Sequence, residues 1–327
     1  MNDHPDDLHR LIHDTLQELG WNADASEIAE RVKRLDIGLP AEDEFAVLCS
    51  WLGKCELLHK LDQHQLPATS GKDYQVPDVL AYFSTQVERR PVLIEVKSKA
   101  ANTLSFKPDY LARLNNYADL VGLPLLVAWK FHSLWMLFEV RHLTKAVRNF
   151  NINFGDAMKE NLLGILAGDV AYKIGPGAGI HLRFQKEELL SVTETDDTKT
   201  ENWRMRITEV AFTGRGGEQV SDLSSDVQSL FTTWDLERRE AHADDHIWVS
   251  HVAGGDGIQF AHTALVRLPD WRLPTGTKVS WRREARKEKL STIADFRGAV
   301  TKALEEKIVQ YVFDIAPHTV PDFLVRS

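Results

Sequence analysis

The chain has 327 residues, of which 43% are hydrophobic and 27% are charged, and its formal net charge is −9 at pH 7. The composition is that of an ordinary globular protein, and the length suits two domains better than one. The negative charge argues against a protein that binds nucleic acid over its whole surface, because phosphate contacts need Lys and Arg. A negative net charge is still compatible with a local basic cleft.

The chain lacks sequence signals for export or membrane insertion. No apolar run reaches the roughly 18–20 residues that a membrane span needs. The first ten residues are acidic and lack the basic-then-apolar order of a signal peptide. We interpret the two cysteines, Cys49 and Cys55, as reduced thiols, and we predict a cytoplasmic protein with no membrane partner.

Helical patterns occupy the beginning of the chain. Apolar residues recur on one helical face over residues 6–19, and Asp24 with Glu27 forms a capping-box pattern that begins a second helix. No basic recognition helix follows, so we interpret residues 1–40 as a helical lid in preference to a helix-turn-helix. A longer helix is predicted over residues 42–61.

Strands and a helix are predicted next. Short β-branched and apolar runs indicate strands, and Pro108 is typical of a first helical turn. The short break after residue 83 predicts that the first two strands form a hairpin. The predicted order is strand, strand, helix, strand and strand, over residues 74–83, 91–99, 108–122, 124–131 and 133–140.

The remainder of the chain gives weaker patterns. We predict a helix over residues 159–170, and the polar residues 191–202 are the best candidate for a linker. Beyond it we expect three strands and a closing helix, over residues 203–212, 245–252, 259–268 and 291–313.

One group of residues points to chemistry. Side chains alternate between the faces of a strand, so Glu95 and Lys97 share one face while Ile94 and Val96 point into the core. Asp78 stands at the start of the neighbouring hairpin strand. Two carboxylates can hold a hard cation such as Mg²⁺, and an ammonium can orient water and stabilise developing negative charge. Phosphodiester hydrolysis needs this combination.

The motif by itself is short and recurs. Pro-Asp occurs five times, and an acid-any-Lys triplet also occurs at residues 197–199 and 305–307. Of these copies, only Asp78 and Glu95 fall on two apolar strands joined by a short turn. The alternative interpretation is a solvated strand face with a weak ion pair, worth about 0–1 kcal/mol.

With their context, Pro77-Asp78 and Glu95-Val96-Lys97 resemble the PD-(D/E)XK nuclease superfamily, in particular its restriction-endonuclease-like and Holliday-junction-resolvase-like members. The resemblance covers residues 42–140. It implies an α/β fold with a restriction-endonuclease-like mixed-sheet core flanked by helices. To this core we add an N-terminal helical segment and a C-terminal α+β domain.

The resemblance also implies residue roles. Asp78 and Glu95 would bind Mg²⁺ or Mn²⁺, the carbonyl of Val96 would be a further ligand, and Lys97 would assist the attacking water. A helix glutamate often joins such a site. Glu44 is our choice because its helical register with Leu48 and Trp51 places it on the buried face, and Glu42 is second.

Three basic residues are candidates for nucleic-acid contacts. Lys99 continues the face of Lys97 along the strand and could touch a phosphate. Arg282 and Arg283 begin a basic stretch that could contact a DNA backbone, although an exposed helix with mixed charges explains it equally well.

We divide the chain into an N-terminal helical segment (1–40), a nuclease-like core (41–145), an extension and linker (146–200) and a C-terminal domain for substrate or partner recognition (201–327). The expected function is a metal-dependent DNA endonuclease in repair, restriction or defence against foreign DNA, with RNA the less favoured substrate. The alternatives are a catalytically inactive binding module on the same fold and a nuclease subunit that needs a protein partner. A homodimer is left open.

Overall fold

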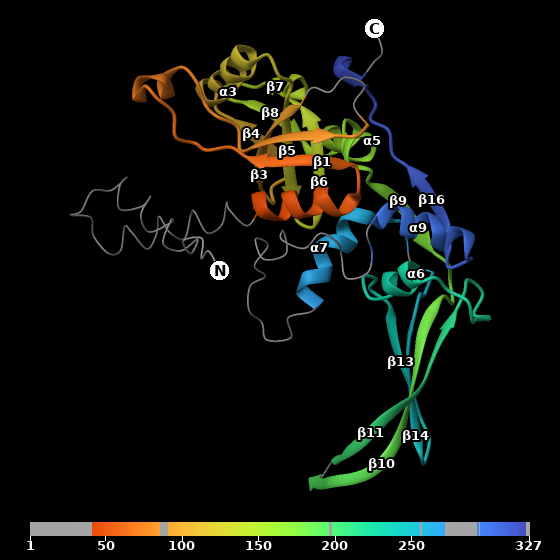
Figure 1. The fold of residues 1–327 in the computed structure, drawn as a ribbon. Helices are drawn as coiled ribbons and strands as arrows, with labels where there is room; N and C mark the ends of the chain where they lie inside the picture. The colour runs from red at the N-terminus through yellow and green to blue at the C-terminus, as the bar shows by residue number, and fades with distance from the viewer. Residues whose placement is uncertain are drawn as a thin grey trace, which may run out of the picture.

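The computed structural model describes residues 41–85, 91–195, 198–255, 257–271, 293 and 295–324. The predicted N-terminal helices and the basic residues Arg282 and Arg283 lie outside the described residues. Figure 1 shows a body of sheets and helices from which a long, twisted sheet projects. No described helix is long and apolar enough to cross a membrane.

A mixed five-stranded sheet forms the centre of the upper body (Figure 1). Strands β3 and β5 are parallel, and the other neighbours are antiparallel. The predicted mixed-sheet α/β fold is therefore confirmed. In spatial order the strands are β1 (Cys55–Lys60), β2 (Val79–Phe83), β3 (Val92–Ser98), β5 (Leu125–Phe131) and β6 (Leu134–Glu139).

Both faces of this sheet are covered. On one face Ile94 and Val96 pack in the same core as Phe45 of the helical residues 41–52. On the other face Leu93 packs with Leu114 of helix α3 (Pro108–Val121). A strand buried on both sides reads as an almost continuous apolar run, which explains the sequence of β3.

Smaller elements surround the central sheet. One three-stranded sheet has the order β4-β8-β7 and another has the order β15-β9-β16. The strands are β4 (Thr103–Phe106), β7 (Thr144–Lys145), β8 (Phe150–Asn153), β9 (Val170–Ile174), β15 (Gln259–Phe260) and β16 (Val309–Asp314). The helices are α4 (Phe154–Lys159), α5 (Leu163–Ala167), α6 (Ser225–Leu230), α7 (Ala261–Trp271) and α9 (Phe296–Glu305), with 3-10 turns η1 (Ala68–Lys72), η2 (Val140–His142) and η3 (Asp322–Leu324).

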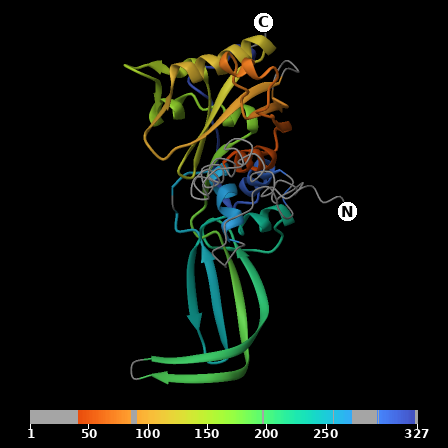
Figure 2. The ribbon, with the colours of Figure 1, turned by 90° about the vertical axis from the view of Figure 1, so that its left-hand side faces the viewer.

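The projecting sheet, which we call the stalk, is antiparallel with the order β12-β11-β10-β14-β13. Figure 2 shows that β10 and β11 continue beyond the other strands. The strands are β10 (Gly179–Thr195), β11 (Thr198–Thr213), β12 (Gln219–Val220), β13 (Glu237–His242) and β14 (His246–Val252).

The predicted linker at residues 191–202 is wrong. Residues 191–195 form the outer part of β10 and residues 198–202 the outer part of β11, and Ser191 lies opposite Asn202. The segment has few apolar residues because this end of the stalk is exposed to solvent, so its composition resembles that of a linker. Amino-acid composition does not reveal the backbone hydrogen bonds between the two strands.

Two predicted helices are too long. The helix over residues 42–61 ends at residue 52, because Gly53 takes a left-handed backbone with φ of 94° and Cys55 begins β1. Both cysteines are free. The closing helix ends at Glu305, and the residues after Lys307 form β16 against β9. In both segments the spacing of the apolar residues fits a helix, but the residues form a strand.

Two further predictions fail near the core. Residues 259–268, expected as a strand, are mainly helix α7, whose Ala264, Leu265 and Leu268 are buried at helical spacing. The helix expected over residues 159–170 is divided between the end of α4 and α5, and β9 follows from Val170.

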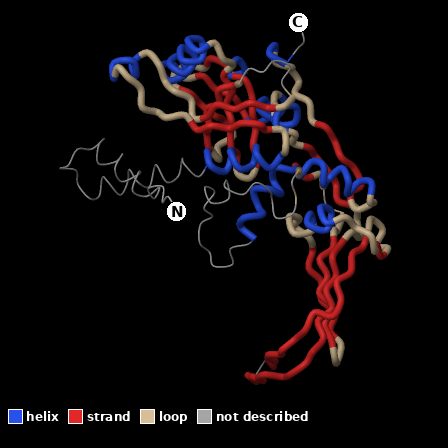
Figure 3. Tube along the Cα trace, viewed as in Figure 1, coloured by secondary structure: helices blue, strands red, loops and turns tan. Residues whose placement is uncertain are grey.

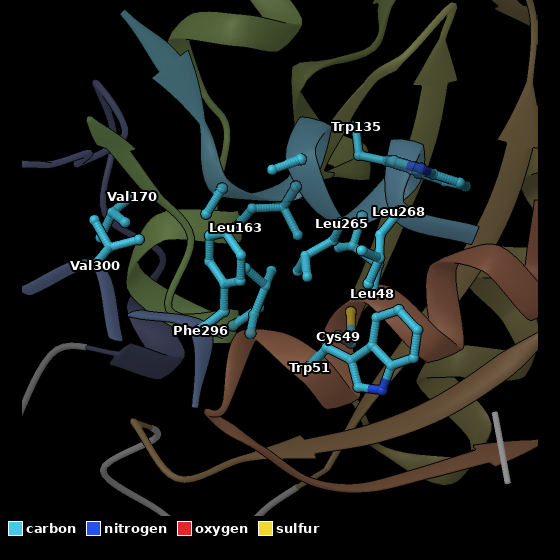
Figure 4. Close-up of a cluster of buried hydrophobic side chains, with 14 of the residues drawn as sticks. Leu48, Cys49, Trp51, Trp135, Leu163, Val170, Leu265, Leu268, Phe296 and Val300 are labelled. Atoms are coloured by element: carbon cyan, nitrogen blue, oxygen red, sulfur yellow. The ribbon is translucent and has the colours of Figure 1, made fainter. Parts of the chain in front are cut away.

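The main core is continuous across the boundary expected after residue 145. Figure 4 shows Leu48 and Trp51 of the first described helix in one cluster with Leu265 and Phe296 from the C-terminal part. The C-terminal region therefore completes the hydrophobic core of the nuclease-like sheet on the face of residues 41–52.

A buried polar contact joins the same two regions. The N–H of Trp135 on β6 donates to Nε2 of His262 on α7 at 3.2 Å, and Nδ1 of His262 donates to Asp169 at 2.7 Å. The side chain of Asn161 accepts a hydrogen bond from Leu137 N at 2.9 Å. These side chains satisfy backbone groups of β6 that would otherwise be buried without partners.

We predict that His262→Ala lowers the free energy of unfolding by roughly 3 kcal/mol, because it leaves Oδ2 of Asp169 and the Trp135 N–H without their partners, while Oδ1 of Asp169 keeps the backbone N–H of residue 262. Denaturant unfolding measures the change. His242→Ala, at an exposed position in the stalk, is the control and changes stability little. Equal stability of the two variants would contradict this role.

Candidate active site

The hairpin brings Asp78, Glu95 and Lys97 together. Val79 lies opposite Ile94 in the β2–β3 register, so Asp78 comes next to Glu95 at the end of β2. Asp78 Oδ2 accepts a hydrogen bond from Val96 N at 2.7 Å. The N–H and carbonyl of one strand residue face the same neighbour, so the Val96 carbonyl also faces the Asp78 side.

Glu95 is the most deeply buried member of the group. Its side chain is inaccessible to solvent, and its Oε1 is contacted by the ammonium of Lys97. The hydroxyl of Tyr110, in the first turn of α3, donates to the same oxygen at 2.5 Å. Sequence reasoning missed Tyr110, although Pro108 placed a helix start directly after this hairpin and β4.

The neighbouring charges change the acidities of the group. Burial, together with the Glu95 carboxylate, raises the pKa of Asp78 to about 7. Burial is the largest single influence on the pKa of Lys97 and lowers it, but Glu95, Tyr110 and Asp78 together outweigh burial and raise that pKa above its usual value. Lys97 thus stays a cation, whereas about half of the Asp78 side chains hold a proton near pH 7 when no further cation is present.

The structure places Glu44 apart from this group. Its Oε1 accepts a hydrogen bond from Trp135 Nε1 at 2.8 Å, and its Oε2 pairs with Lys130 Nζ at 2.5 Å. The side chain is nearly inaccessible to solvent. Glu44 therefore forms an ion pair with Lys130, and both of its carboxylate oxygens have partners.

Glu42, the second choice from the sequence, lies nearer. Burial raises its pKa, and the charge of Asp78 raises it further. Lys60 Nζ pairs with Glu42 and with Asp43, at 2.8 Å in each case. Lys60 comes from β1, a segment expected to be helical, which explains why it was missed.

The oxygen donors suit a hard divalent cation. Glu95 Oε2 is buried and has no hydrogen-bond partner. Asp78 and the Val96 carbonyl lie on the same side, and such donors are preferred by Mg²⁺ and Mn²⁺. Within the described residues, no three His, Cys, Asp or Glu side chains are arranged to hold an ion by themselves. A complete ligand set would thus need the backbone carbonyl, water or substrate oxygens.

Lys99 follows the end of β3. Its backbone is fixed by hydrogen bonds from Lys99 N to Lys130 O at 3.0 Å and from Trp129 Nε1 to Lys99 O at 2.9 Å. A contact of its side chain with phosphate remains a prediction.

Comparison with known proteins identifies relatives of the central region. Residues 65–167 match the family of archaeal Holliday junction resolvases (Hjc). The predicted resemblance to the PD-(D/E)XK nuclease superfamily is confirmed. A solved structure of Hjc, a Holliday junction resolvase from the archaeal hyperthermophile Archaeoglobus fulgidus, is 23% identical. The match covers 36% of this chain and 89% of that chain, with a TM-score of 0.30. No curated protein matches.

The Hjc-like region, residues 65–167, contains Asp78, Glu95, Lys97 and Tyr110. The helix of Glu42 and the strand of Lys60 precede it. The stalk and the C-terminal helices follow it, so most of the chain is additional to the matched region.

We predict that Asp78→Asn stabilises the fold at high pH. The folded-state pKa of Asp78 is above its unfolded value of about 3.9, so the carboxylate destabilises the fold as pH rises from about 4 through about 7. The variant should be more stable than the unaltered chain by on the order of 2–4 kcal/mol at pH 8, and equally stable near pH 4.

Unfolding at the two pH values, without added divalent cation, measures this difference. Asp222→Asn, at an exposed position, is the matched control, and it should shift stability equally at both pH values. A pH-independent effect of Asp78→Asn would show that Asp78 is not under electrostatic strain.

Proposed function

We propose that this chain is a divalent-metal-dependent endonuclease that cuts DNA, with branched or junction-like DNA as its substrate class. The observation that carries the proposal is the buried hairpin that gathers Asp78, Glu95 and Lys97 and leaves Glu95 Oε2 without a partner. The match to a family of Holliday junction resolvases supports DNA, and junctions in particular.

The proposed ligands are Asp78, Glu95 and the Val96 carbonyl, with Glu42 in place of Glu44 as the helix acid. The charge of Asp78 raises the pKa of Glu42, whereas both carboxylate oxygens of Glu44 are bound to Lys130 and Trp135. A bound Mg²⁺ or Mn²⁺ would polarise the phosphoryl oxygen and lower the pKa of a water molecule.

The chain's own residues would orient the reaction. Lys97 keeps its proton, so it acts as a hydrogen-bond donor to the attacking water and to the negative charge that develops on the phosphate. One third of its side chain is exposed, which leaves the ammonium accessible to substrate. Tyr110 holds Oε1 of Glu95 and thereby leaves Oε2 for a ligand role.

We assign the chemistry to residues 41–145 and substrate or partner recognition to residues 201–327. Repair, restriction and defence against foreign DNA are all compatible with this chemistry. The alternative is a nuclease that needs a protein partner. The large C-terminal region outside residues 65–167 favours this alternative, because it could bind such a partner.

We predict that Asp78→Ala and Lys97→Ala each reduce DNA cleavage by at least about 1,000-fold, because the first removes a ligand of the proposed cation and the second removes the ammonium that stabilises negative charge on the phosphate. The assay offers a four-way junction, a linear duplex and single-stranded RNA to the purified chain with Mg²⁺ or Mn²⁺. Asp322→Ala, which changes another Pro-Asp pair, is the control and keeps full activity.

Cleavage that survives both substitutions would reject this site. Cleavage of RNA alone would reject the DNA substrate. A folded chain that binds the junction and cuts nothing would favour an inactive module or a missing partner, and adding extract from the native host separates these two cases.

A second experiment distinguishes the two helix acids. We predict that Glu42→Gln lowers cleavage by roughly 10–100-fold with little change in stability. Glu44→Gln should instead lower the free energy of unfolding by about 3–5 kcal/mol, because it leaves the Lys130 charge buried without its partner. Loss of activity at full stability in Glu44→Gln, with normal activity in Glu42→Gln, would restore Glu44 as the ligand.

A further inference from the structure

The stalk has one apolar face. Residues directly opposite in neighbouring strands share a face. The register places Leu182 beside Val210 and Val249, and the next row outward holds Phe184 beside Ile207 and Ile247. We call these six side chains the apolar stripe.

Two β-bulges keep the apolar residues on this face towards the tip. β11 has an extra residue between Glu209 and Ile207, and β10 has an extra residue between Lys186 and Glu188. Simple alternation would turn Ile207 to the opposite face, because side chains alternate with a period of two. The next row on this face holds Lys186 opposite Met205, and beyond the second bulge Leu189 lies opposite Trp203, whose ring the Lys186 ammonium covers.

The apolar stripe is partly open to solvent. Its β11 residues Ile207 and Val210 are 51% and 52% exposed, and its four residues on β10 and β14 are half-buried. The opposite face is mainly polar, with Arg183, Gln185 and Ser250, although Trp248 lies beside Arg183 on it. An antiparallel sheet normally buries its apolar face, and exposed apolar patches with polar rims mark interaction sites.

The outer end of the stalk has too few strands to be stable by itself, which is a second indication that something packs against it. Strand β14 pairs with β10 only as far as Gln185, so beyond it the described stalk is a ribbon of β10 and β11 alone. Figure 3 shows strands without an accompanying described helix along this end. A two-stranded ribbon is marginally stable in water unless it packs against something.

The charges of the stalk indicate what can pack there. Strands β10, β11, β13 and β14 contain seven Lys or Arg and seven Glu residues. Several are paired within the sheet, as in Arg204 with Glu188 and Arg206 with Glu187. Basic residues that already have carboxylate partners are poor ligands for a polyanion. Two copies of a neutral surface can meet without repulsion, although the whole chain carries −9.

We propose that the apolar stripe is the contact surface between two copies of this chain. The two stalks would pack face to face around a two-fold axis, so that the same side chains are buried in each copy. The surface lies outside the Hjc-like region, and the proposal does not depend on nuclease activity.

The size of the surface agrees with this role. Three strands, roughly 14 Å wide, extend roughly 17 Å from Ile180 to Gln185, and two strands, roughly 9 Å wide, continue roughly 13 Å to Leu189. The projected area is about 350 Å², and side chains increase the accessible area towards the roughly 800 Å² per partner of a stable interface.

Sedimentation of the full chain between about 1 and 100 µM tests the proposal. We expect Ile207→Glu and Val210→Glu each to weaken the stalk association at least tenfold and to halve the sedimenting mass at intermediate concentration. Both positions are half exposed, so the monomer fold should survive, and circular dichroism checks it. Asn202→Glu adds the same charge to the polar face of β11 and should leave the mass unchanged.

A purified chain that is monomeric at about 100 µM would overturn the proposal. An association equally strong in the stripe variants and in Asn202→Glu would overturn it as well, because the contact would then lie elsewhere. Loss of DNA affinity in the stripe variants at unchanged mass would assign the face to nucleic acid instead.

Discussion

The site depends on the electrostatic conflict between two carboxylates, Asp78 and Glu95, that the hairpin holds together away from solvent. Like charges in a buried place disfavour ionisation, and here the pKa of Asp78 rises to about 7 even with Lys97 beside it. The fold tolerates this because β3 is covered on both faces and Tyr110 and Lys97 satisfy one oxygen of Glu95. In the proposed function, the remaining negative charge would attract a divalent cation, so the same conflict that weakens the fold would give the site its affinity.

The C-terminal region completes the structure that holds this hairpin in place. Residues of α7 and α9 fill the core under the helix of Glu42, and His262 satisfies the backbone of β6. Trp135 connects the two sets of contacts, since its indole donates to Glu44 and its N–H donates to His262. The nuclease-like sheet and the C-terminal elements therefore form one packed body, from which only the stalk projects.

Three failures of sequence interpretation, at residues 55–60, 309–314 and 191–202, have one physical origin. Residues 55–60 and 309–314 have apolar spacing that suits either a helix or a strand, and pairing with β2 and β9 decides in favour of the strand. The polar hairpin tip around residue 195 has the composition of a linker, yet its backbone is hydrogen bonded across the two strands. Pairing partners come from distant positions, so local patterns cannot reveal them.

The sequence by itself determined which three charged side chains the hairpin brings together. Asp78, Glu95 and Lys97 are placed by a short turn and by strict alternation along a strand, both of which are local rules. Only the tertiary structure distinguishes the two helix acids, because the charge of Asp78 acts on Glu42 whereas Glu44 is bound to Lys130 and Trp135. The contributions of Tyr110 and Lys60, and the open apolar face of the stalk, likewise arise from contacts between segments far apart in the chain.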